Sequence, residues 1–278
     1  MNRRILILAA LAIAATGAPV AAQRFEPTRF SVETVGRGPD VIMIPGLTAG
    51  RETWRGTAAA VPGYRYHLIH VSGFAGAPAR GNARGAIMTP LADELARYIV
   101  DRRLRRPAIV GHSMGGTLAM MIAARRPELA GRIMVVDMLP QPAGLFGGSA
   151  SGWGPLAGSL GNFLATPGGR RLFGGLMTAF SPPDTANRHS DPDVVGRVMR
   201  ELATIDQARD IARIRAPLTV VYASPDIRAR AVIDRQFASA YAAARGARLV
   251  RIEPSGHMVM LDQPARFRAA IREFLLRS

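Results

Sequence analysis

Short apolar runs that alternate with helical segments are the feature of this sequence that most constrains its fold. The runs are rich in β-branched residues and end at glycine, proline or polar residues, as buried strands do. Between several of them, apolar residues recur at helical spacing, as at 91, 95, 98 and 99. Alternation of this kind predicts the α/β class, with a mostly parallel central sheet flanked by helices on both faces. The expected strands lie at 40–44, 64–71, 107–110, 133–136, 218–222 and 248–252, with a weaker edge strand at 29–35.

Two helices are expected late in the chain, at about 228–245 and 264–276. An earlier helix is expected to open at Thr89 and Pro90, with the threonine as its N-cap and proline at its first helical position.

One stretch, at about 139–204, breaks the alternation. It holds many glycines and prolines together with aromatic and apolar residues, whereas a linker of this length would be polar. We expect a largely helical lid inserted over one end of the sheet, within one domain that spans residues 23–278.

The N-terminus has the layout of a secretory signal peptide. A basic start at Arg3 and Arg4 precedes an apolar run and a stretch of small residues that ends at Ala22. The apolar run is too short to span about 30 Å of hydrocarbon. We therefore expect residues 1–22 to be removed, leaving a protein that is periplasmic or secreted and not stably inserted in a membrane.

Composition excludes several classes of site. The chain has no cysteine, and all 36 of its basic residues are arginine. Disulfides, zinc–thiolate sites, a cysteine nucleophile, a Schiff-base lysine and a Walker-type phosphate loop are therefore absent. The histidines are scattered and form no cluster with carboxylates, so neither a metal nor a cofactor is expected.

The formal net charge is +16, which raises the question of nucleic acid. A nucleic-acid-binding region would concentrate its charge, whereas these arginines are spread along the chain, mostly singly and without interleaved aromatics. We interpret them as a solvated surface and expect no nucleic-acid partner. Attraction to an anionic envelope surface or to acidic substrates remains an alternative.

The motif GHSMGG at residues 111–116 predicts a nucleophile elbow at Ser113. It follows an apolar strand and precedes a helical segment, which is the context the motif requires. The sharp turn between the two holds the serine in a strained conformation with its hydroxyl exposed, and the flanking glycines avoid clashes there.

A serine needs a base to remove its proton. Of the five histidines, His257 fits best, because it follows the last expected strand and so lies at the carboxyl edge of the sheet, where Ser113 also lies. His112 adjoins the serine along the chain and points elsewhere, which favours packing or local hydrogen bonding. His67 and His70 lie within a strand, and His189 belongs to the insertion.

Two aspartates compete to orient this base. Asp226 follows the strand at 218–222 and gives the chain order Ser, Asp, His, so it is the preferred candidate. Asp137 directly ends the strand at 133–136 and is the rival. Asp262 is expected to cap the final helix instead.

Acyl transfer also needs two donors for the oxyanion of its tetrahedral intermediate. The backbone N–H of Met114, which follows the nucleophile, is one candidate. The backbone N–H of Leu47, in the loop after the strand at 40–44, is the other, with Thr48 as its substitute. Gly46 lets this loop approach closely.

Taken together, these motifs resemble the α/β-hydrolase superfamily, in its single-domain, lid-bearing, esterase-like branch. The resemblance runs from about residue 40 to 275 and rests on the Pro-Gly-Leu at 45–47, the Gly-Phe-Ala-Gly at 73–76, the elbow, Asp226 and the Ser-Gly-His at 255–257. Many relatives carry His-Gly before the oxyanion residue, where this chain has Pro45 and Gly46. A serine at the elbow argues against the dehalogenases and epoxide hydrolases that resemblance would otherwise include.

The resemblance implies hydrolysis of a carboxylic ester of a small-molecule acyl substrate, through an acyl-enzyme on Ser113, His257 and Asp226. Peptidase, thioesterase, lactonase, carbon–carbon hydrolase, lyase and perhydrolase chemistry can use the same residues, and a non-catalytic scaffold bound to the envelope is a further alternative.

Overall fold

The fold is a seven-stranded sheet covered by helices, seen in a computed structural model that describes residues 25–143 and 189–276. The strand order is β1-β3-β2-β4-β5-β6-β7. Every neighbouring pair is parallel except β1 with β3, which is antiparallel. The predicted class and mostly parallel sheet are therefore confirmed, including an edge strand at the weakly alternating N-terminal run. The strands are β1 (Phe30–Gly36), β2 (Asp40–Ile44), β3 (Arg65–Val71), β4 (Ala108–His112), β5 (Arg132–Val136), β6 (Leu218–Ala223) and β7 (Arg248–Ile252).

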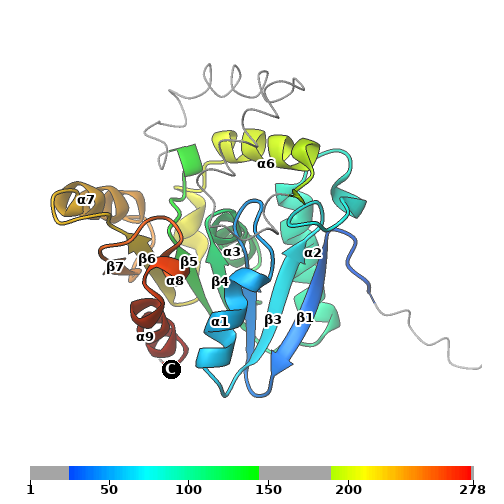
Figure 1. The fold of residues 1–278 in the computed structure, drawn as a ribbon, viewed down its shortest axis with the longest axis horizontal. Coiled ribbons are helices and arrows are strands. Elements are labelled where there is room, and N and C mark those ends of the chain that lie inside the picture. Colours follow the sequence, from blue (N-terminus) through cyan, green and yellow to red (C-terminus); the bar gives the residue numbers. More distant parts are fainter. Residues whose placement is uncertain (1–24, 144–188, 277–278) are drawn as a thin grey trace, which may run out of the picture.

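Helices cover both faces of this sheet (Figure 1). Along β2, Ile42 and Ile44 pack into one core and Val41 and Met43 into the other, because successive side chains of a strand point to opposite faces. The first core includes residues of α2, α3 and α7, and the second includes residues of α1 and α9. The helices described are α1 (Glu52–Ala60), α2 (Met88–Asp101), α3 (Met114–Arg125), α6 (Pro192–Thr204), α7 (Arg230–Ala240), α8 (Val259–Asp262) and α9 (Pro264–Leu276), with short 3₁₀ turns at Arg80–Asn82 and Asp210–Arg213.

Helix α2 does not begin as the sequence predicted. Thr89 lies inside the helix rather than at its N-cap, and no side chain within the local sequence caps the first turn. The carboxylate of Glu201, from α6, accepts hydrogen bonds from the backbone N–H groups of Ile87 and Met88, both at 2.8 Å. A distant acidic side chain thus satisfies the free donors at the helix N-terminus and meets the positive end of its dipole.

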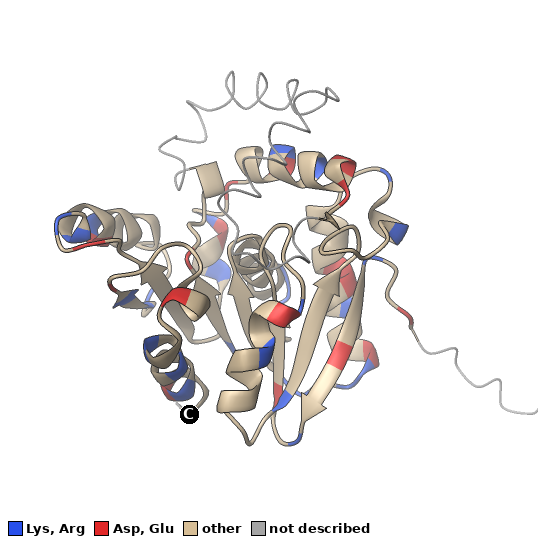
Figure 2. Ribbon diagram, viewed as in Figure 1, with Lys and Arg blue, Asp and Glu red and all other residues tan. Residues whose placement is uncertain are grey.

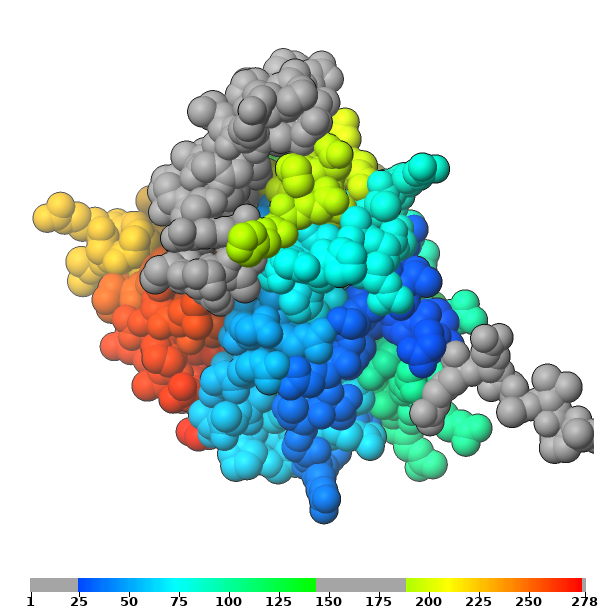
Figure 3. Space-filling view, turned by 45° about the vertical axis from the view of Figure 1, so that its right-hand side comes forward, coloured from blue at the N-terminus to red at the C-terminus, as the bar shows by residue number. Residues whose placement is uncertain are grey.

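Helix α6 lies across the carboxyl ends of the parallel strands (Figure 1). Its Val194 packs so closely on the loop after β3 that a Cβ at Gly73 would lie 2.8 Å from Val194 Cγ2. The Asp191 N–H donates to the Gly73 carbonyl at 2.7 Å, and Arg197 donates to the carbonyls of Asn82 and Gly85. In Figure 3, α6 (yellow-green) is seated directly against the cyan segment that precedes α2. This helix falls within the expected lid, of which the structure describes residues 139–143 and 189–204.

Two predictions fall wholly or mainly on residues that the structure does not describe. The signal peptide at 1–22 lies outside the described ranges, as does the middle of the expected lid, residues 144–188. Both stay predictions, and so does export. None of the helices in the described ranges is long and apolar enough to span a membrane.

Basic residues are distributed along many of the described helices, strands and loops, among acidic ones (Figure 2). Several guanidinium groups are paired with carboxylates, for example Arg55 with Glu33 and Arg248 with Glu273, both at 2.6 Å. Pairing of this kind is typical of a solvated surface, and exposed pairs contribute little to stability.

Candidate active site

Ser113 occupies the sharp turn that joins β4 to α3. Strand β4 ends at His112, α3 begins at Met114, and the serine between them has φ 51° and ψ −122°. This conformation is unfavourable for a residue with a side chain. A Cβ at Gly111 would lie 2.1 Å from the Gly115 carbonyl oxygen, so the turn requires glycine there. The predicted elbow geometry is therefore present at Ser113.

His257 is paired with Asp137, the rival candidate of the sequence analysis. Its Nδ1 lies 2.7 Å from Asp137 Oδ2, while Asp137 Oδ1 accepts a hydrogen bond from the Ala223 N–H at 2.9 Å. The Asp137 side chain is 9% exposed and that of His257 is 47% exposed. The carboxylate is thus buried and held by two hydrogen bonds, whereas the imidazole is partly exposed to solvent.

The prediction that Asp226 orients His257 is wrong in this geometry. Asp226 is exposed, and its Oδ1 accepts hydrogen bonds from the N–H groups of Arg228 and Ala229, at 2.7 and 3.0 Å. Strand β6 ends at Ala223, so the chain has already turned toward α7 by the time it reaches Asp226. The Asp226 carboxylate, which the chain order had favoured as the partner of His257, therefore accepts hydrogen bonds within a local turn instead.

Asp137 reaches the histidine because it follows its strand at once. Strand β5 ends at Val136, and Asp137 has a φ of 49°, which turns the chain sharply at the sheet edge. The Val136 carbonyl accepts the Ser113 N–H at 2.9 Å, so the aspartate and the serine stand at the ends of neighbouring strands.

The loop that carries His257 is braced by residues whose roles the sequence analysis missed. Asp262 was expected to cap a helix, but its Oδ2 accepts the Gly256 N–H at 2.9 Å. Gln263 Nε2 donates to the Pro254 carbonyl at 2.6 Å. On the inner side, His112 Nε2 lies 2.9 Å from the His257 carbonyl oxygen. No local pattern identifies these contacts, because each depends on how the loop folds back.

The two candidate oxyanion donors lie on segments that meet at the elbow. A Cβ at Gly46 would lie 3.2 Å from Ser113 Cβ, so the loop that carries Leu47 closely approaches the serine. The next residue, Thr48, is buried with a φ of 62°, an unusual conformation for a β-branched residue. Met114 is the first residue of α3, where backbone N–H groups lack partners within the helix and the dipole favours negative charge.

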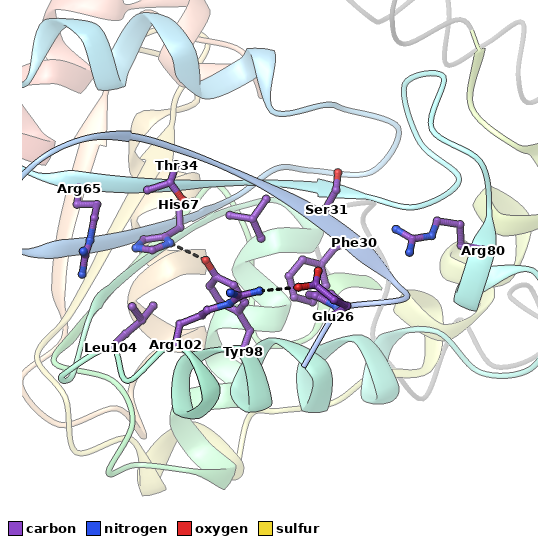
Figure 4. Close-up of a pocket in the computed structure, with 12 residues that line it drawn as sticks. Glu26, Phe30, Ser31, Thr34, Arg65, His67, Arg80, Tyr98, Arg102 and Leu104 are labelled. Atoms are coloured by element: carbon purple, nitrogen blue, oxygen red, sulfur yellow. Dashed lines mark hydrogen bonds and ion pairs between the residues drawn. The ribbon is translucent and has the colours of Figure 1, made fainter. Parts of the chain in front are cut away.

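His67 belongs to a separate, structural network. Its Nδ1 lies 2.7 Å from the Tyr98 hydroxyl and its Nε2 2.9 Å from Asp40 Oδ1. Burial lowers the pKa of His67 despite the nearby carboxylate. The network borders a cavity of about 500 Å³ on the side of β1 and α2, where Arg102 is paired with Glu26 (Figure 4). None of the hydrogen bonds and ion pairs described for this network involves Ser113 or His257, so we assign it to the stability of the fold.

The structure also places the two remaining histidines, apart from the pair formed by His257 and Asp137. His70 Nε2 donates to the Phe74 carbonyl at 3.0 Å, and His189 is exposed. Within the described ranges, no group of three or more histidine, aspartate and glutamate side chains is arranged to hold a metal ion.

His112 makes the stability of the protein sensitive to acid. Burial, followed by the nearby His257, lowers the pKa of His112 to about 3 from 6.5. Between those pH values the unfolded chain binds a proton at this residue and the folded chain does not, so stability falls as the pH falls. We expect the free energy of unfolding to lose about 3 kcal/mol from this residue between pH 7 and pH 4.

Urea unfolding of the wild type and His112→Gln at several pH values checks this expectation. Glutamine does not titrate, so the wild type should lose about 3 kcal/mol more than the variant over the same range. Equal losses in the two proteins would show that His112 is not held neutral by burial.

Comparisons with known proteins agree with this architecture. A family model described as "Alpha/beta hydrolase family" matches residues 41–270. A pimeloyl-[acyl-carrier protein] methyl ester esterase of Nitrosomonas europaea is 28% identical over 110 residues, which are 39% of this chain and 41% of that protein. The same esterase of Aeromonas hydrophila is 30% identical over 111 residues, 40% of this chain and 42% of that protein. The alignment therefore spans about two fifths of these relatives.

Among solved structures, the enol-lactonase from Burkholderia xenovorans superimposes with a TM-score of 0.70. The superposition covers 89% of this chain and 96% of the lactonase, at 18% sequence identity. At that identity the likeness concerns the fold alone.

Proposed function

Because the chain belongs to the alpha/beta hydrolase family, we propose that it is a serine hydrolase that cleaves a carboxylic ester or a related acyl bond. The observation that carries the proposal is the 2.7 Å contact between His257 Nδ1 and Asp137 Oδ2, beside the turn that presents Ser113. In this proposal Ser113 is the nucleophile, His257 the general base and Asp137 the residue that orients the base.

The pairing with Asp137 determines which nitrogen of His257 acts. An ionised carboxylate only accepts hydrogen bonds, so the proton of the neutral imidazole resides on Nδ1. The lone pair of Nε2 is then free to take the proton of the Ser113 hydroxyl. Asp137 also stabilises the imidazolium that forms, and its burial strengthens that interaction.

The proposed reaction has two acyl-transfer steps. Ser113 Oγ attacks the carbonyl carbon as its proton passes to His257 Nε2, and the carbonyl oxygen becomes an oxyanion. The backbone N–H groups of Met114 and Leu47 are the proposed donors to that oxyanion. The imidazolium then protonates the departing alcohol and leaves an acyl-enzyme. Water, deprotonated by His257, attacks the acyl-enzyme in the same way and releases the acid and free Ser113.

The names of the two curated relatives favour oxygen esters, since both are methyl ester esterases. A lactone is a cyclic ester and needs no other chemistry. A substrate panel tests the proposal: p-nitrophenyl acetate, butyrate and octanoate, a simple methyl ester, a γ-lactone, an acyl thioester and a peptide anilide. We expect turnover of at least one oxygen ester or lactone. A folded protein that turns over nothing in the panel would contradict the proposal and favour the non-catalytic scaffold.

A further inference from the structure

His112 is a fully buried imidazole at the end of β4, next to the proposed nucleophile. It is 2% exposed. Its Nε2 lies 2.9 Å from the carbonyl oxygen of His257, and because a carbonyl can only accept, the Nε2 atom carries the hydrogen. A neutral imidazole has one N–H group, so Nδ1 carries none.

The ring of His112 lies between the two loops on which the proposed reaction depends. On one side it packs against the His257 ring, with 4.7 Å between centroids and 47° between planes. On the other side lies the loop of the candidate oxyanion donor, so close that a Cβ at Gly46 would be 2.8 Å from His112 Nδ1. A movement of this ring would therefore disturb both loops.

Packing alone does not account for a histidine in this position. Nδ1 is buried, and among the described residues it has no hydrogen-bond partner. A buried acceptor without a partner costs free energy that an apolar side chain of similar volume would not. The contact that offsets this cost is the one to the carbonyl of His257.

We propose that His112 is a positioning residue for His257: its Nε2–H holds the backbone of the base loop so that Nδ1 of His257 meets Asp137 while Nε2 faces Ser113. This inference rests on the proposed function. Burial also keeps His112 neutral, with a pKa of about 3, so it places no second positive charge beside His257 when the base takes up its proton.

Two substitutions separate hydrogen bonding from packing. His112→Leu removes the donor, and we expect kcat to fall about 10- to 100-fold with little change in KM, because a small misplacement of a catalytic group has effects of this size. His112→Gln retains an N–H donor and should recover most of the loss. The matched control is His70→Leu, which removes a histidine that donates to the Phe74 carbonyl instead; we expect it to keep the wild-type kcat.

Each result bears on the inference. A wild-type kcat in His112→Leu would overturn the inference. Equal losses of kcat in the leucine and glutamine variants would overturn it as well. An inactive wild type would overturn the proposed function, and this inference with it. If His112→Leu does not fold, NMR of the wild type labelled with ¹⁵N-histidine replaces it and measures the tautomer of His112. The His112 signal is assigned by its absence from the spectrum of His112→Gln. A His112 signal fixed as the Nε2–H tautomer from pH 5 to 9 supports the inference, and one that titrates in that range overturns it.

Discussion

Replacing Asp137 with asparagine is expected to lower kcat/KM for an ester substrate by about 10³- to 10⁴-fold. The amide can still accept the Ala223 N–H through its oxygen, but its NH₂ group then faces Nδ1 of His257. That donor favours the imidazole tautomer with its hydrogen on Nε2, which cannot take the proton of the Ser113 hydroxyl. Steady-state hydrolysis of the best substrate of the panel measures the effect.

The matched control is Asp226→Asn. An asparagine oxygen can accept the same two backbone N–H groups in the turn before α7, so both activity and stability should stay close to wild type. Reversed results, with a large loss at 226 and a small one at 137, would restore the assignment that chain order favoured and contradict the one that the geometry supports.

Ser113→Ala is expected to lower kcat/KM by at least about 10⁴-fold, because the proposed nucleophile is lost while the fold is retained. Ser113→Gly should be equally inactive but more stable than the alanine variant. The backbone of residue 113 has a φ of 51°, which glycine adopts at no steric cost. Relief of this strain stabilises the glycine variant, and the larger loss of conformational entropy by glycine on folding offsets part of the gain. The net difference in the free energy of unfolding is about 1 kcal/mol in favour of the glycine variant.

Urea unfolding of the two variants checks the stability difference, and the ester assay checks their inactivity. A glycine variant less stable than the alanine variant would indicate that residue 113 is not strained. Residual turnover near the wild-type rate in either variant would mean that another group is the nucleophile.

The strand-to-helix turn at Ser113 could be predicted from sequence because its signals are local. A Cβ at position 111 or 115 would clash with neighbouring backbone atoms, so the turn requires glycine at both positions, and both glycines are visible in the sequence. The place of His257 was also predictable, since a residue just after a parallel strand must lie at the same sheet edge as the elbow.

The partner of His257 could not be chosen in the same way. Asp137 and Asp226 both follow strands. Asp137 comes directly after β5 and has a positive φ, whereas Asp226 is the third residue after the end of β6. The positive φ of Asp137 leaves no mark on the sequence, whereas the hydrogen bonds of Asp226 to the following turn are common for any exposed aspartate.

The start of α2 shows a second limit. Its capping carboxylate, Glu201, is more than 100 residues away along the chain, so the local pattern pointed to Thr89 instead. Contacts of this kind depend on how α6 crosses the sheet edge, and neither periodicity nor capping preference contains that information.

Intact-mass analysis after treatment with a small fluorophosphonate tests whether Ser113 is an activated nucleophile, because the reagent reacts with an activated serine. Wild type, Ser113→Ala, Asp137→Asn and Asp226→Asn are compared. A single adduct is expected on the wild type and on Asp226→Asn, with slow labelling of Asp137→Asn and no labelling of Ser113→Ala. A folded wild type that forms no adduct, or an adduct that persists in Ser113→Ala, would contradict the assignment of Ser113 as the nucleophile.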